Sequence, residues 1–208
     1  MRNTIVFCLM AFWVSTLQAQ SASDELQWEE VYKKENTTVS TCFPKQETAD
    51  GSNEVVFHWK LSSTQRASFE SCIRIINSIA LHKQLYDCES SELIEQTDST
   101  RLAYYNFNSP WPISDMDLVR SISNSLDEKN QVFVSQHISA PKAFKDKGFK
   151  RLQISEIVYR LEKLPNGDTR INMQGKFIPV GVPQVLAKAW FPKGPVKIVD
   201  KIVELSKK

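Results

Sequence analysis

The chain contains the stretch Pro110-Trp111-Pro112-Ile113-Ser114-Asp115-Met116-Asp117-Leu118-Val119, which joins two β-rich runs, 102–107 and 118–122. Each proline fixes its own φ and restricts the residue before it to extended geometry. Ser114 and Asp115 offer side-chain oxygens that can cap a turn. The residues alone therefore predict a rigid corner between antiparallel strands, anchored by Trp111, with a direct chemical role as the alternative.

Apolar residues alternate on both sides of this corner, and turn signals separate the runs, which predicts strands. The clearest pair is a hairpin turning at 165–168, because Asn166-Gly167 supplies the positive φ that a tight turn needs. Its return strand places Ile171, Met173 and Phe177 on one face. The strands are expected at 28–32, 37–43, 54–61, 90–96, 100–107, 117–123, 131–138, 152–163 and 169–177.

Two segments change to a helical period. Apolar residues from 64 to 82 predict one amphipathic helix, broken near Asn77-Ser78, whose start is a capping box, Ser62-x-x-Gln65. A second, long helix is expected at 183–206, either kinked at the interruption 191–195 or divided there into two abutting helices. The order of strands, helix, strands and long helix indicates an α+β fold in which a curved antiparallel sheet packs around the C-terminal helix.

The N-terminus resembles a targeting segment. Arg2 precedes an apolar run, 5–14, and small and polar residues follow up to Ala19, which is typical of a secretory signal peptide. We therefore expect residues 1–19 to be a signal peptide, and residues 24–208 to be one exported domain in the periplasm or outside the cell.

The charges of the chain are balanced. Lys and Arg number 26 and Asp and Glu 24, and without Arg2 the basic residues number 25. This balance gives no reason to expect binding to nucleic acid. Transient contact with a membrane stays open, and we expect a monomer.

Cysteines and histidines give no metal pattern. Three cysteines follow the apolar leader, Cys42, Cys72 and Cys88, without a Cys-x-x-Cys pair. Export would allow one disulfide among them, whereas the place of Cys72 on a helix favours plain burial. The three histidines are far apart in the sequence and match no ligand spacing, so no metal or cofactor is expected.

The corner resembles the central signature of START (StAR-related lipid-transfer) domains, in which a Pro-Trp-Pro turn leads into Ser-Asp-Arg-Asp-Phe-Val. Three further segments resemble that family in the same order along the chain. They are Pro141-x6-Gly148-x2-Arg151, then Gly175-Lys176-Phe177-Ile178-Pro179, then Lys193-Gly194-Pro195. The resemblance covers nearly the whole chain after the leader, and it implies a helix-grip fold.

The chain departs from the family pattern at two places. Met116 stands where the family usually has Arg, and Asn172-Met173-Gln174 replaces an acidic segment. If the family's Arg and acid form a pair near the cavity, this chain lacks that pair, so its site is expected to be more apolar. Asp115 and Asp117 are kept, and such acids usually cap turns.

The resemblance implies a binding protein that holds one hydrophobic ligand, of the lipid or sterol class, in a cavity under the C-terminal helix. Strand alternation selects the residues expected to face this cavity. Arg120 either binds a head group or shows that this strand face is outward. The predicted lipid-binding residues are Tyr105, Phe107, Met116, Leu118, Arg120, Phe133, Ile157, Tyr159, Met173, Phe177, Val185, Ala189 and Trp190, and plain core packing is the alternative for each.

Two other functions stay open. The first is an exported structural or protein-interaction domain with a fully packed interior. The second is an enzyme, since relatives of the helix-grip fold include cyclases and hydrolases, and Asp117 with Tyr105 could act as an acid–base pair. The chain has no Gly-x-Ser-x-Gly, no His-Glu-x-x-His and no phosphate-binding Gly-rich loop. We therefore expect no enzyme activity.

Overall fold

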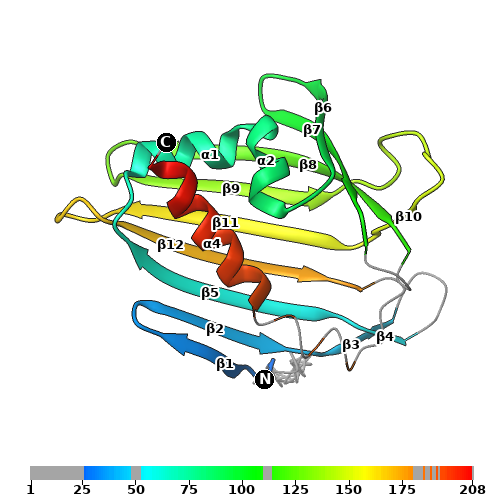
Figure 1. Cartoon of the computed structure of the whole chain (residues 1–208), viewed down its shortest axis with the longest axis horizontal. Helices are drawn as coiled ribbons and strands as arrows, with labels where there is room; N and C mark the ends of the chain where they lie inside the picture. The colour runs from blue at the N-terminus through cyan, green and yellow to red at the C-terminus, as the bar shows by residue number, and fades with distance from the viewer. Residues whose placement is uncertain are drawn as a thin grey trace, which may run out of the picture.

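One large sheet dominates the fold. The computed structural model describes residues 26–47, 53–109, 114–179, 185, 188, 191 and 193–207. Within these residues, ten strands form a sheet in the order β1-β2-β5-β12-β11-β9-β8-β7-β6, with β10 paired to β8 (Figure 1). All the pairs are antiparallel except β10 with β8. A hairpin of β3 and β4 forms a separate small sheet.

The strands follow the alternation in the sequence closely, and several bounds agree to the residue. They are β1 (Glu29–Lys34), β2 (Thr37–Cys42), β3 (Lys45–Glu47), β4 (Asn53–Val55), β5 (Phe57–Gln65), β6 (Ser90–Gln96), β7 (Thr100–Phe107), β8 (Met116–Asp127), β9 (Val132–Ser139), β10 (Lys150–Arg151), β11 (Ser155–Lys163) and β12 (Thr169–Phe177). The predicted hairpin is β11–β12, and Gly167 in its turn has φ 86°.

Helices α1 (Phe69–Asn77), α2 (Ile79–Tyr86) and α4 (Lys193–Ser206) lie on the same face of the sheet. Figure 1 shows α4 crossing the strands diagonally, with α1 and α2 beside its C-terminal end. Val199, Ile202 and Leu205 of α4 are buried against the sheet and α1. The predicted α+β helix-grip architecture is therefore confirmed.

The first helix starts later than predicted. Residues up to Gln65 continue strand β5, so the proposed capping box at Ser62 is wrong. The N-cap is Ser68, whose hydroxyl oxygen accepts from the backbone N of Ser71 at 3.2 Å. The predicted break is confirmed, because α1 ends at Asn77 and α2 starts at Ile79.

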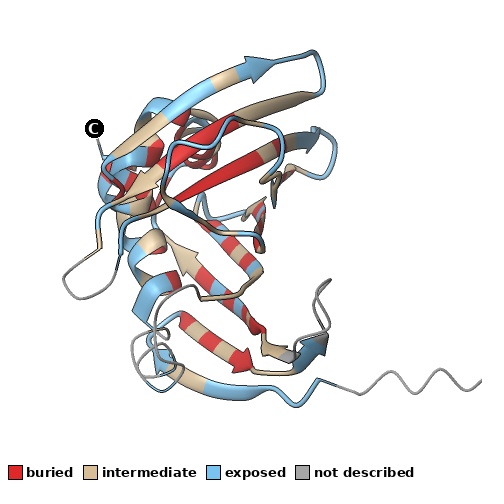
Figure 2. Cartoon of the chain, turned by 90° about the vertical axis from the view of Figure 1, so that its right-hand side faces the viewer, coloured by how far each residue is buried: buried red, intermediate tan, exposed pale blue. Residues whose placement is uncertain are grey.

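The core lies between the sheet and the helices. Strand β5 alternates buried and less buried residues, and Figure 2 shows the same banding on its ribbon. Trp59 and Leu61 of β5 join Ile75 and Ile76 of α1 and Ile202 of α4 in one apolar cluster. Among the described residues, no helix has both the length and the apolar character that crossing a bilayer requires.

Candidate ligand-binding site

The Pro-Trp-Pro corner itself, residues 110–113, lies outside the described residues. On its two sides, the Asp115 carboxylate accepts from the backbone N of Ser109 at 2.9 Å, so this acid bridges the start and the end of the connection. This hydrogen bond joins residues six positions apart, so it is a contact across the connection and not a local turn cap.

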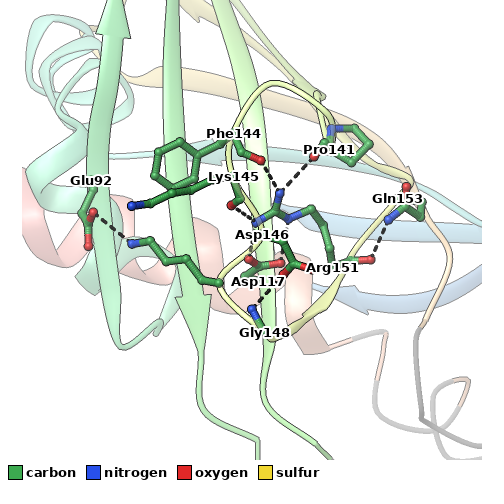
Figure 3. Close-up of polar contacts among 10 residues, drawn as sticks. Glu92, Asp117, Pro141, Phe144, Lys145, Asp146, Gly148, Arg151 and Gln153 are labelled. Carbon is green, nitrogen blue, oxygen red and sulfur yellow. Dashed lines mark hydrogen bonds and ion pairs between the residues drawn. The ribbon is translucent and has the colours of Figure 1, made fainter.

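The next acid, Asp117, links two segments that are far apart in the sequence, the stretch 110–119 and the segment 141–151. Its carboxylate accepts from Nε and Nη2 of Arg151 at 3.0 and 2.6 Å, a bidentate ion pair (Figure 3). Arg151 also donates to the carbonyl oxygens of Pro141, Phe144 and Lys145. One guanidinium thus joins the start of β8 to the 141–151 loop, and Asp117 has a structural role.

A pocket of about 700 Å³ lies between α4, the end of α2 and strands β5, β11 and β12. Its volume falls within the range of small-molecule sites in proteins. The apolar part of its lining comes from all of these elements and from Phe191, two residues before α4. It consists of Trp59, Leu85, Ile157, Phe177, Phe191, Pro195 and Ile198.

Charged side chains of both signs lie around the same pocket. Lys176 and Glu156 form an ion pair at 3.2 Å, and their side chains are about one-third exposed. Lys197 and Asp200 of α4 and Asp87 after α2 also line the pocket and are exposed. The site therefore combines an apolar lining with charged groups that remain in contact with water.

Gly175 provides part of the space beside Trp59. A Cβ at this position would lie 2.5 Å from the carbonyl oxygen of Glu156 and 2.7 Å from Cε2 and Cζ2 of the Trp59 indole. The indole ring can pack against the backbone of β12 only because Gly175 has no side chain.

Gly175→Ala is expected to lower the free energy of unfolding by about 1–3 kcal/mol, because both neighbouring groups are fixed by the sheet and the core. Urea denaturation measures this change. Gly194→Ala is the matched control, since a Cβ added there would meet nothing within 4 Å and the change should stay within about 1 kcal/mol. Equal stability of Gly175→Ala and the parent protein would contradict the packing described here.

A cluster of buried polar side chains lies next to the pocket. Nε2 of His82 is 2.9 Å from the carbonyl oxygen of Ile76, which can only accept, so this nitrogen carries the hydrogen. Nδ1 of His82 then accepts from the Tyr105 hydroxyl at 2.8 Å. The hydrogen bonds therefore assign the neutral tautomer of His82.

A second hydrogen-bonded chain crosses three elements. The Tyr86 hydroxyl of α2 is 2.9 Å from the Tyr159 hydroxyl of β11 and 3.3 Å from Nδ1 of His137 on β9. Nε2 of His137 is 3.0 Å from the Ser135 hydroxyl. The ring centroids of His82 and His137 are 5.6 Å apart, so the two sets of hydrogen-bonded side chains form one cluster.

Arg120 of β8 lies in the same cluster, and only 4% of it is exposed. Its Nη2 donates to the Ser155 hydroxyl at 2.9 Å, and its guanidinium carbon is 5.3 and 5.7 Å from the ring centres of Tyr86 and Tyr105. Its Nε has no hydrogen-bond partner among the described residues. Arg120 therefore faces the helices, and the alternative of an outward strand face is excluded.

Burial sets the protonation of this cluster. Desolvation lowers the pKa of His82 to about 4, and the charges of Arg120 and Arg101 act in the same direction. Desolvation also holds the pKa of His137 well below its usual value and the pKa of Tyr105 well above. At neutral pH both histidines are therefore neutral beside the cationic Arg120.

Strand pairing places most of the predicted lipid-binding residues on the helix-covered face. Tyr105 pairs with Leu118, and Tyr159 pairs with Met173. Ile157 and Phe177 line the pocket itself. On the same face, outside that lining, are Tyr105, Phe107, Met116, Leu118, Arg120, Phe133, Tyr159 and Met173.

Three of the predicted lipid-binding residues, Val185, Ala189 and Trp190, were expected on the C-terminal helix. Val185 is 80% exposed, so it does not face the sheet as predicted. Ala189 and Trp190 lie outside the described residues. Asp117 and Tyr105 are on opposite faces of the sheet, since Tyr105 pairs with Leu118, and the suggested acid–base pair is therefore not formed.

Several residues at the site were not predicted. Trp59 follows the same alternation as Phe57 and Leu61, so its inward direction could have been found from the sequence. Tyr86 lies beyond the predicted helix end at residue 82. No spacing in the sequence relates His82 to His137, and the described residues contain no group of three or more His, Cys, Asp or Glu side chains that could hold a metal ion.

The three cysteines are free and buried in the described structure. Cys72 lies on α1, as predicted. Burial raises the pKa of the Cys72 and Cys88 thiols to about 11, so neither is activated as a nucleophile.

Solved structures with the same architecture identify the fold. A STAR-related lipid transfer protein from Xanthomonas axonopodis superposes with a TM-score of 0.72 at 17% identity, over 87% of this chain and 99% of that chain. The fold is the START-like helix-grip fold. Human StAR-related lipid transfer protein 5 superposes with a TM-score of 0.70 at 16% identity, over 86% of each chain.

An enzyme shares the START-like fold at greater distance. The Zhui aromatase/cyclase from a Streptomyces species has a TM-score of 0.51 and 10% identity, over 73% of this chain and 94% of that chain. No family model matches the sequence, and none of the curated proteins matches it. The structural similarity therefore establishes the fold, which occurs in lipid-transfer proteins and in an aromatase/cyclase.

Proposed function

We propose that the chain binds one hydrophobic ligand, a lipid or a sterol-like molecule, in the pocket beneath α4. The pocket carries this proposal, because about 700 Å³ beside the C-terminal helix is left unfilled and is lined by Trp59, Phe177 and Phe191. Structures of lipid-transfer proteins with the same fold support it.

The energetics are consistent with such a ligand. Burial of a sixteen-carbon chain stabilises a complex by roughly 12 kcal/mol at about 0.8 kcal/mol per CH2. Association costs of the order of 4–15 kcal/mol. The gain from one alkyl chain or sterol-sized ring system in this pocket is therefore comparable to the cost of association. Transfer between membranes requires the site to open and close, and α4 forms one wall of it.

Filling the pocket tests the proposal. Ile198→Trp adds an indole to the pocket wall on α4 and is expected to weaken uptake of fluorescent lipids and sterols at least about tenfold. Val196→Trp is the matched control, because Val196 is half-buried on the same helix but does not line the pocket. Equal loss in both variants, or no loss in Ile198→Trp, would place the ligand elsewhere.

We propose binding as the function in preference to catalysis. The cyclase neighbour and the buried histidines give a reason to test the second candidate, an enzyme. Burial lowers the pKa of both histidines, however, which makes them weak bases, and Asp117 is paired with Arg151 on the face of the sheet opposite Tyr105. Recovery of a chemically altered ligand after incubation with the protein would favour the enzyme.

We also propose that the protein is exported, on the evidence of the N-terminal sequence pattern. N-terminal sequencing of the protein recovered from its own host tests this. A start close to residue 20 is the expected result, and an intact Met1 in the cytoplasm would contradict it.

A further inference from the structure

The feature that carries this inference is the buried charge of Arg120. Of the ion pairs among the described residues, none includes Arg120. Asp117, three residues before Arg120 in β8, lies on the other face of the sheet and is neutralised by Arg151. A buried cation without a counter-ion is costly, so its retention needs an explanation.

Among the described residues, the contacts of Arg120 do not supply the missing negative charge. The guanidinium contacts the rings of Tyr86 and Tyr105 and the hydroxyl of Ser155, all of which are neutral at physiological pH. The cluster therefore has a net positive charge, and the buried Nε–H of its guanidinium has no acceptor among the described residues.

Ser155 and Tyr86 connect Arg120 to the pocket. Both residues line the pocket, and both contact the guanidinium. The Ser155 hydroxyl oxygen accepts a hydrogen bond from Arg120 Nη2. No described residue accepts the hydrogen of this hydroxyl. This hydroxyl can therefore donate to a ligand, and the neighbouring positive charge makes it a stronger donor.

The enclosure limits what kind of anion can reach this point. Tyr105, His137 and Tyr159, which belong to the same hydrogen-bonded cluster, are fully buried. A phosphodiester has substituents on both sides and needs room beyond the phosphate, whereas a carboxylate ends the molecule. A carboxylate also carries a single negative charge, which balances one guanidinium, and two oxygens that match its donors.

We propose that the ligand is an amphiphile with a terminal carboxylate, of the fatty-acid class, and that Arg120 and Ser155 bind this carboxylate at the inner end of the pocket. The inference rests on the proposed binding of a hydrophobic ligand and specifies its head group. The apolar chain extends from Ser155 along Ile157 and Phe177 toward α4.

The test compares an acid with its neutral analogue. The probes are cis-parinaric acid and the corresponding primary alcohol, whose fluorescence reports binding at neutral pH. The parent protein is expected to bind the acid about tenfold to a hundredfold more tightly than the alcohol, as charge-assisted hydrogen bonds imply. Arg120→Met is expected to remove this preference and to keep the affinity for the alcohol.

Three further variants make the test specific. Arg120→Lys keeps the charge without the planar fork and should restore part of the preference. Ser155→Ala should reduce the preference and keeps the test informative if Arg120→Met does not fold. Arg160→Met removes the same charge on the opposite face of the sheet, where Arg160 pairs with Glu162, and should leave the preference unchanged.

The outcomes separate this inference from the proposed function. Equal affinity of the parent protein for acid and alcohol, or an unchanged preference in Arg120→Met and Ser155→Ala, would overturn the carboxylate site and leave the hydrophobic pocket in place. Failure of the parent protein to bind either probe would overturn both proposals.

Discussion

Arg151→Ala is expected to lower the free energy of unfolding by about 3–5 kcal/mol, because it leaves the fully buried Asp117 carboxylate without its counter-ion. The same change removes the hydrogen bonds from Arg151 to the carbonyl oxygens of Pro141, Phe144 and Lys145. These hydrogen bonds hold the loop after β9 (Figure 3). Chemical denaturation of the variant and the parent protein measures the loss.

Arg160→Ala is the matched control for this prediction. Arg160 also makes an ion pair with an acid, Glu162, at 2.8 Å, but its side chain is 50% exposed. Exposed ion pairs contribute about 0–1 kcal/mol, so the control should lose little stability. Similar losses in the two variants would show that the Asp117–Arg151 pair does not hold the corner of the sheet to the loop.

The stability of the protein is expected to fall by about 3 kcal/mol or more between pH 6.5 and pH 4. Burial lowers the pKa of His82 from 6.5 to about 4, and the pKa of His137 is lowered further in the same direction. The unfolded chain therefore binds more protons than the folded protein within this window. The free energy of unfolding then rises with pH up to about 6.5 and levels off above it.

Urea denaturation at a series of pH values measures this slope. His82→Gln is the informative variant, because an amide can still donate to the carbonyl oxygen of Ile76 but does not titrate. Its slope below pH 6.5 is expected to be smaller than that of the parent protein, whatever its stability at neutral pH. Identical slopes would mean that His82 is not held neutral by burial.

Most of the fold could be predicted from the sequence because the alternation of apolar residues is strong. The bounds of β7 and β12 agree with the predicted 100–107 and 169–177 to the residue. The start of α1 could not be placed, because β5 has Ser62, Ser63 and Thr64 at its end. These small polar residues resemble a helix cap, but they are held in the sheet by pairing with β12 and β2.

The site was predictable only in part. The direction of Arg120 depends on which face of β8 the helices cover, and alternation alone leaves that choice open. The polar cluster depends on long-range pairing, which brings β9 between β8 and β11 and so places His137 near His82. No local pattern in the sequence reports such a contact, whereas the corner, the Asp117 segment and the Arg151 segment could each be recognised locally.

The most direct test of the central claim, a hydrophobic ligand bound under α4, is native mass spectrometry of the protein purified from its own host. A one-to-one complex that releases an amphiphile on extraction into organic solvent is the predicted result, and a terminal carboxylate on that molecule is the finer expectation. Protein that has only the mass of its own chain, and that takes up no member of a panel of fatty acids, phospholipids and sterols, would contradict the claim.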